Sequence, residues 1–241
     1  MNKMIFILLS FLSLIACEPQ IEGSKQEETT SDTLEIKITG SVKEVMLRGE
    51  LGSKIDLDTL EEREGLYGLG PLENLRGELM IYNGRSYVSR VGDYPFMKVN
   101  EEYNVSAPFF VYTNVTKWKQ LELPEIFNTR HLELIIDSLN PEKDKPFVFR
   151  LEGVVKRARI HIQNLPLGTE VSSPKQAHSG QINYELRARP SKIIGFFSRR
   201  HKGIFTHIDS YVHMHLLSDD LEMMGHIEQL ETRNIKLYIP E

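Results

Sequence analysis

Three histidines near the C-terminal end of the chain have a spacing that suits metal binding. His213 and His215 are two residues apart in an apolar run, residues 211–217, so on a strand both rings would point to the same face. The following Ser218-Asp219-Asp220 favours a turn, which would bring His226 to the same patch from a second strand. Three neutral imidazoles are typical ligands of catalytic zinc, which keeps its fourth position for water or substrate. The sequence therefore predicts a zinc site.

The other histidines limit this prediction. The chain has eight histidines, and a pair separated by one residue is common by chance, so the triplet alone leaves a metal site and a coincidence open. Four of the others have polar or basic neighbours and are predicted to be surface residues, namely His131, His178, His201 and His207. The zinc site therefore needs support from elsewhere in the chain.

The N-terminal residues predict export and lipid attachment. Residues 1–16 combine Lys3 with an apolar run too short for a membrane span, which is typical of a signal peptide. Leu14-Ile15-Ala16-Cys17 resembles the lipobox of bacterial lipoproteins, and Cys17 is the only cysteine of the chain. We expect lipidation of Cys17 and anchoring to the cell envelope, in the outer membrane of a Gram-negative host because Glu18 follows. The alternative is a noncleaved anchor with an incidental cysteine.

Composition separates a tether from a folded domain. Residues 17–32 are rich in Glu, Gln, Ser and Thr and contain almost nothing apolar, which predicts a flexible tether before a domain over residues 33–241. The whole chain has 40% hydrophobic residues and a net charge of −5. Because proteins that bind nucleic acid usually carry a clustered basic excess, nucleic acid is excluded as a partner.

The hydropathy pattern of the domain predicts an α+β fold, rich in strands, with mixed or antiparallel sheets and a few short helices. The strongest signal is Asn83-Gly84, which predicts a hairpin between residues 77–82 and 85–90. Short helices are expected over residues 41–49, with Ser41 as the cap, and 57–63, a longer one over 124–139, and an irregular glycine-rich loop over 65–71. Further strands are predicted at residues 34–39, 107–113, 147–155, 157–162, 182–188, 192–197, 211–217 and 236–239.

Several segments, in order, resemble the alpha-acetolactate decarboxylase family. The segment from Gly68 to Pro71 and the following Gly77-Glu78-Leu79 are similar to its glycine-rich loop and the strand after it. Residues 107–113 resemble its Ser-Pro-Phe strand, and residues 194–196 its strand ending in Gly-Phe. Residues 213–220 with Gly225-His226 resemble its zinc signature. Matches in the right order are more specific than any one of them.

The resemblance implies a zinc-dependent lyase that converts 2-acetolactate to acetoin and carbon dioxide, with zinc acting as a Lewis acid. It implies that His213, His215 and His226 bind zinc, and that Glu78, on the inward-facing phase of its strand, orients the substrate and could transfer a proton. The family's arginine, which pairs with the substrate carboxylate, aligns with His161. A shift of two residues along the strand would place Arg159 there instead. The resemblance also implies a homodimer, the expected assembly of family members.

Three functions remain open at this point. The first is the active decarboxylase. The second, favoured by the histidine at the arginine position and by the family's longer C-terminal tail, is a degenerate zinc-binding envelope lipoprotein. It would bind a small hydroxy-keto acid or a protein partner without turnover. The third is a structural lipoprotein without metal. For Glu78 itself, the alternative to a site residue is a solvated strand charge.

Overall fold

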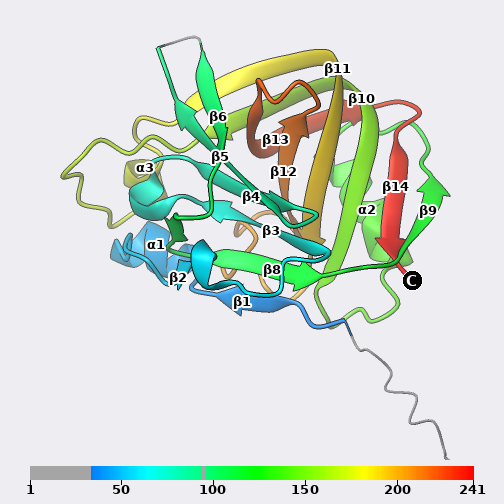
Figure 1. Ribbon diagram of the computed structural model, residues 1–241, viewed down its shortest axis with the longest axis horizontal. Coiled ribbons are helices and arrows are strands. Elements are labelled where there is room, and N and C mark those ends of the chain that lie inside the picture. Colours follow the sequence, from blue (N-terminus) through cyan, green and yellow to red (C-terminus); the bar gives the residue numbers. More distant parts are fainter. Residues whose placement is uncertain (1–33, 94–95) are drawn as a thin grey trace, which may run out of the picture. The chain divides into compact units, whose positions relative to one another are not determined.

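The computed structural model describes residues 34–93 and 96–241. Most of the strands in this part of the chain belong to two six-stranded antiparallel sheets (Figure 1). The first sheet has the order β1 (Lys37–Thr39), β8 (Phe110–Asn114), β3 (Leu66–Pro71), β4 (Glu78–Tyr82), β5 (Arg85–Val91) and β6 (Met97–Glu101). The second has the order β11 (Ile182–Phe197), β12 (Val212–Ser218), β13 (Met224–Thr232), β10 (Phe147–Ile162), β14 (Lys236–Pro240) and β9 (Trp118–Glu122). The predicted signal peptide, the predicted lipidation site Cys17 and the predicted tether lie outside the described residues.

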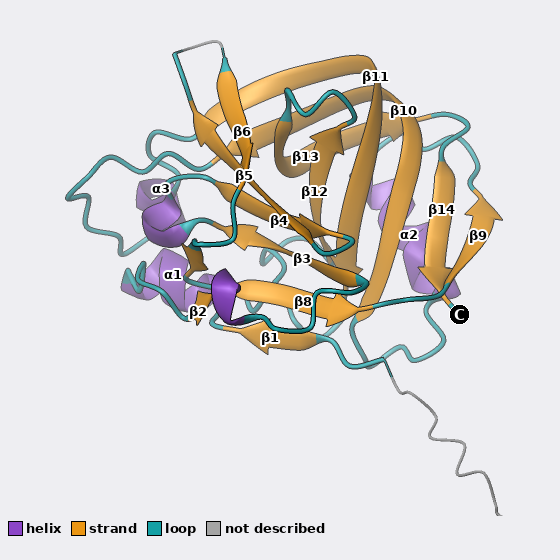
Figure 2. Ribbon diagram, viewed as in Figure 1, coloured by secondary structure: helices purple, strands orange, loops and turns teal. Residues whose placement is uncertain are grey.

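Short elements complete the fold. β2 (Ile55–Asp56) pairs with β7 (Ser106–Ala107), and single 3₁₀ turns form at η1 (Leu57–Thr59) and η2 (Glu73–Leu75). The helices are α1 (Val42–Arg48), α2 (Thr129–Leu139) and α3 (Pro174–Ala177), shown in purple in Figure 2. None of the helices in the described residues has the length and apolar content needed to span a membrane.

A closed circuit of four strands holds the histidine-bearing segment. β10 and β11 pair along their whole length, from Phe147 opposite Phe197 to Ile162 opposite Ile182. β12 pairs with β11 on one side and with β13 on the other, and β13 pairs with β10. Each long strand was predicted as two shorter ones, with gaps at residue 156 and at residues 189–191, yet the pairing of β10 with β11 keeps one register on both sides of these gaps. The circuit fixes β12 and β13 on both sides.

The first sheet confirms the hairpin and corrects the predicted loop. Asn83 and Gly84 adopt positive φ angles of 49° and 78° between β4 and β5, as this turn requires. The glycine-rich segment is not an irregular loop but the buried strand β3. A Cβ atom on Gly68 would lie 2.6 Å from Cε1 of Phe110. These glycines therefore give room to an aromatic ring on the next strand, a role that composition alone does not separate from a turn.

The helices agree only in part with their predictions. Ser41 caps α1, accepting a hydrogen bond from the Glu44 N–H, as expected. The helix predicted over residues 124–139 begins only at Thr129, because Ile126 forms a β-bridge with Thr232. The helix predicted over residues 57–63 is wrong, since this segment forms only η1 before it becomes irregular.

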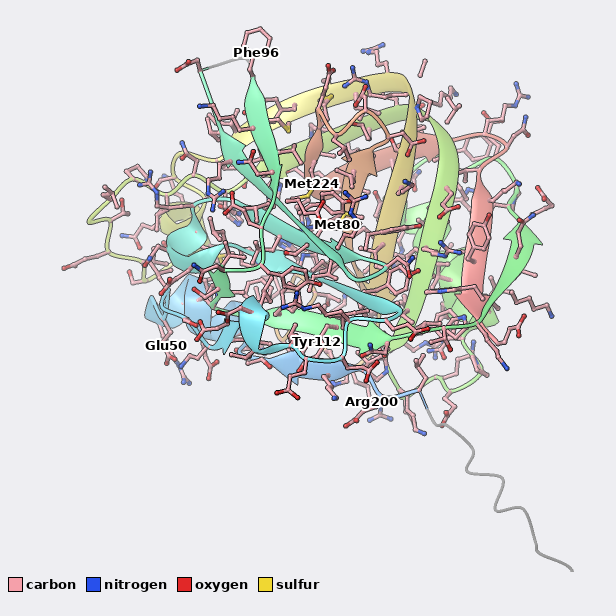
Figure 3. All side chains as sticks on the ribbon, in the orientation of Figure 1. Glu50, Met80, Phe96, Tyr112, Arg200 and Met224 are labelled. Atoms are coloured by element: carbon pink, nitrogen blue, oxygen red, sulfur yellow. The ribbon has the colours of Figure 1, made fainter. Side chains whose placement is uncertain are left out.

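The core lies between the sheets and beneath α2. One apolar cluster joins the inner faces of both sheets and includes Met80 of β4 and Met224 of β13, which lie close together at the centre of Figure 3. A second cluster packs Leu132 and Ile136 of α2 against the second sheet. The first sheet thus covers β12 and β13 from one side, and β4 brings its side chains next to theirs.

Gly195 is a position where this packing can be tested. It pairs with Phe149 across β10 and β11, and a Cβ atom there would lie 2.4 Å from Cζ of the fully buried Phe149 ring. Gly195→Ala is expected to lower the free energy of unfolding by about 1–3 kcal/mol, because the ring must move within a packed core. Chemical denaturation measures this change. Gly52→Ala is the control, because its nearest neighbour, Oε1 of Glu73, is 4.0 Å away; equal stability of the two variants would contradict the argument.

Candidate metal centre

Three buried histidines converge on one point of the second sheet. His213 and His215 project from β12, and His226 of β13 is the register partner of His215. Their candidate ligand atoms all lie within 4.8 Å of one another. β13 approaches this closely because Gly225 has no side chain: a Cβ atom there would lie 2.5 Å from the carbonyl oxygen of His161 on β10. The predicted triplet is therefore brought together by adjacent strands.

The chemistry of these rings fits a divalent metal. Nδ1 of His213 and both ring nitrogens of His215 are buried without a direct hydrogen bond, which is costly unless another partner binds them. Burial lowers the pKa of His213 and His226 well below the usual value, and that of His215 to about 3. All three rings are therefore neutral at pH 7, the form that binds a metal. Three imidazole ligands would leave one position of a tetrahedral zinc ion open.

Glu78 reaches the same point from the first sheet. Its side chain is 2% exposed, so it is not a solvated strand charge. Oε2 lies 3.6 Å from Nε2 of His215, and Oε1 accepts a hydrogen bond of 3.0 Å from the backbone N–H of Gln163. Burial raises the pKa of the Glu78 carboxyl well above its usual value. The site therefore combines three neutral imidazoles with a carboxyl group that burial makes harder to ionise.

A cavity of about 630 Å³ opens beside His226. It is lined by polar side chains from α2, β10, β11, β13 and two loops, including Thr129, Arg159, His161, His178, Gln181, Asn183, His207, Asp209 and Glu228. His178 and His207 were predicted to be surface residues rather than ligands. Both are instead part-buried and line this cavity, although neither belongs to the triplet. Burial lowers the pKa of His207 to about 4, so this ring too is neutral at pH 7. The cavity is large enough for a small polar substrate.

Comparison with known proteins decides the family. The model of the alpha-acetolactate decarboxylase family matches residues 25–241. This chain belongs to that family. No curated protein sequence matches the chain significantly.

Solved acetolactate decarboxylases share the fold. The match to the enzyme of Bacillus subtilis subspecies spizizenii covers 85% of this chain and 85% of that enzyme at 19% identity, with a TM-score of 0.71. That of Bacillus subtilis strain 168 covers 86% of this chain and 85% of its own at 18% identity, with a TM-score of 0.72. A Staphylococcus aureus protein described as similar to alpha-acetolactate decarboxylase matches at 16% identity over 85% of this chain and 84% of its own, with a TM-score of 0.73. The predicted α+β, strand-rich fold is confirmed, with antiparallel ladders throughout the named strands.

Two residues were predicted for the position that the family resemblance gives to an arginine, His161 and Arg159. His161 lies 3.9 Å from Glu78, measured between Nε2 and Oε1, and its ring stacks on His226 with centroids 4.6 Å apart. Arg159 also faces the cavity, whereas Arg157 pairs with Glu185 on an exposed surface. Both Arg159 and His161 are thus at the site, each with one nitrogen already bound by a carboxylate that the sequence patterns did not single out.

That carboxylate is Glu228. It lies two residues after His226 on β13, so strand periodicity alone would have placed it on the same face. Hydrogen bonding to His161, with a further contribution from Arg159, lowers the pKa of Glu228 to about 2, so it is ionised at neutral pH. Glu241 lies exposed after β14, and its N–H donates a hydrogen bond to the carbonyl of Lys117.

Proposed function

We propose that this protein decarboxylates 2-acetolactate to acetoin and carbon dioxide with a zinc ion bound by His213, His215 and His226. A zinc ion in this position would supply Lewis-acid stabilisation of negative charge that develops on the substrate oxygens. The observation that carries the proposal is the convergence of Glu78 from one sheet with three neutral imidazoles from the other, next to a polar cavity.

The side chains around the ligands have distinct tasks in this proposal. Glu78 faces the metal centre from the closed side, where its burial lets it hold a proton for the carbon that loses carbon dioxide. Arg159 lines the cavity with its two terminal nitrogens unbound by Glu228, and these suit a carboxylate. His161 lies between Glu78 and the cavity, and the family resemblance aligns it with the family's arginine. The substrate would therefore bind between β4 and the cavity wall.

A second function has a specific observation in its favour. The Nε–H of Arg159 is already engaged by Glu228 at 2.7 Å, and a histidine occupies the position that aligns with the family's arginine. A protein with this wall could hold zinc and a small hydroxy-keto acid, or a protein partner, without turning over. Retained zinc with ligand binding but no product would support this reading.

One experiment separates the functions. The full-length chain is loaded with zinc and incubated with racemic 2-acetolactate, while acetoin is measured by colour formation and zinc by elemental analysis. Zinc-dependent acetoin supports the decarboxylase. Stoichiometric zinc with no acetoin would exclude the decarboxylase and favour the second function. A protein that takes up no zinc would favour the third, a structural lipoprotein without metal.

The proposed location is the cell envelope, with the protein attached through a lipid on Cys17, and the proposed assembly is a homodimer. The lipobox-like segment supports the anchor. Cells fed a radiolabelled fatty acid are expected to label the wild-type protein and not the Cys17→Ser variant, because the thiol is the attachment point. Equal labelling of both would rule out the anchor, and sedimentation of the detergent-solubilised protein tests the dimer.

A further inference from the structure

A single carboxylate in the cavity wall holds three neighbouring side chains. Oε2 of Glu228 accepts a hydrogen bond of 2.7 Å from Nε of Arg159. Oε1 lies 3.1 Å from Nδ1 of His161 and accepts a hydrogen bond of 3.1 Å from Nε2 of Gln181. The Glu228 side chain is 25% exposed, so these bonds form in partly desolvated surroundings.

The bonds to Glu228 determine which nitrogens of Arg159 and His161 remain available to a substrate. An ionised carboxylate can only accept hydrogen bonds, so Nδ1 of His161 must carry the hydrogen. Nε2 of the same ring then faces inward, 3.9 Å from Oε1 of Glu78 and 3.4 Å from Nε2 of Gln163. For Arg159, engagement of Nε leaves both terminal nitrogens for the cavity. One group therefore sets the direction of two candidate substrate contacts.

We propose that Glu228 is a positioning residue: it fixes the Nδ1–H form of His161 and aims Nε2 of that ring and the terminal nitrogens of Arg159 at the substrate. This inference rests on the proposed decarboxylase function. It assigns no contact between Glu228 and the substrate itself. Outer groups of this kind hold the orientation of a site, and their loss commonly reduces activity or affinity by about 10–100-fold.

A neighbouring ion pair shows what an ordinary surface contact looks like in this sheet. Glu185 on β11 lies 3.0 Å from Nε of Arg157, the same geometry as the pair of Glu228 with Arg159. Both side chains of that pair are more than two-fifths exposed, at 43% and 44%, and neither lines the cavity. Glu185 also lies opposite Arg159 across the β10–β11 ladder but makes its bond to Arg157. Glu185→Gln is therefore a matched control: it removes an arginine–carboxylate bond and a nearby negative charge but none of the bonds of Arg159 and His161 to Glu228.

The test replaces Glu228 by glutamine in the full-length, zinc-loaded chain. In Glu228→Gln the amide oxygen is expected to stay with the charged Arg159, so the amide NH₂ faces His161 and requires a lone pair on Nδ1. His161 should then change from the Nδ1–H to the Nε2–H form, which ¹⁵N NMR of histidine-labelled protein reports directly. We expect kcat for 2-acetolactate to fall about 10–100-fold, with zinc content unchanged.

The controls separate positioning from a structural role. Glu185→Gln should keep both the tautomer and kcat within about twofold of the wild type, as expected of an exposed pair. Glu228→Asp keeps a carboxylate and should restore the Nδ1–H form with part of the activity. If Glu228→Gln does not fold, Glu228→Asp still tests the proposal through the tautomer of His161 and the value of kcat.

Two outcomes would overturn the inference. The first is an Nε2–H form of His161 in the wild type, and the second is a Glu228→Gln variant that matches Glu185→Gln in both readouts. Failure of the proposed function would look different, because a wild-type protein that makes no acetoin still reports the tautomer of His161.

Discussion

His215→Ala is expected to remove zinc from the protein and to abolish acetoin formation. His215 is fully buried at the centre of the triplet, and neither of its ring nitrogens has a direct hydrogen bond that would compete with the metal. Loss of an outer partner of a ligand already costs about 10–100-fold in metal affinity, so loss of a ligand should cost more than about 100-fold. Elemental analysis after dialysis against a chelator, together with the acetoin assay, measures both effects.

His131→Ala is the matched control for this substitution. His131 lies on α2, where its ring stacks on Phe127 with centroids 5.4 Å apart, and it does not line the cavity. It should keep zinc and activity. Full zinc content in a folded His215→Ala protein would show that the metal is bound at another place in the chain.

Local sequence patterns are sufficient to predict the triplet. Residues two apart on a strand share a face, and a polar turn reverses the chain, so strand periodicity and turn chemistry alone place His213, His215 and His226 together. The register that sets His226 directly opposite His215 follows from the short connection between β12 and β13. Glu78 was predicted from the family resemblance, and its strand was fixed by the Asn83-Gly84 turn.

Contacts between distant segments explain why other site residues could not be predicted. His178 and His207 occur in polar surroundings along the chain, and only the fold of two loops around β13 turns their rings into the cavity. The same holds for Gly68, whose role depends on Phe110 from another strand. Glu228 is different, since period two links it to His226, and the face that it shares with a ligand was a usable signal.

Glu78→Gln is expected to reduce kcat by about 10²–10⁴-fold while zinc stays bound, because proton transfer by a placed side chain contributes about that much. Glutamine has nearly the same shape and keeps an oxygen for the Gln163 N–H, so the effect reports the lost proton rather than a lost contact. Zinc content and steady-state kinetics measure it. Glu73→Gln is the control, since Glu73 is a half-buried carboxylate that binds Ser53 and Ser106 away from the metal centre. A Glu78→Gln variant with kcat near that of Glu73→Gln would exclude Glu78 from the chemistry.

The same variant has a second effect in the metal-free protein, and its sign follows from burial. Because the pKa of Glu78 is raised above its ordinary value of 4.5, the folded protein keeps a proton that the unfolded chain releases. The free energy of unfolding contributed by this group therefore falls as pH rises above 4.5, and glutamine, which does not ionise, removes that loss. With chelator present, Glu78→Gln should match the wild type near pH 4 and become the more stable protein as the pH approaches 7, where thermal unfolding shows the difference. A wild type that instead gains stability relative to Glu78→Gln as the pH rises from 4 to 7 would mean that the Glu78 carboxyl is ionised in the folded, metal-free protein.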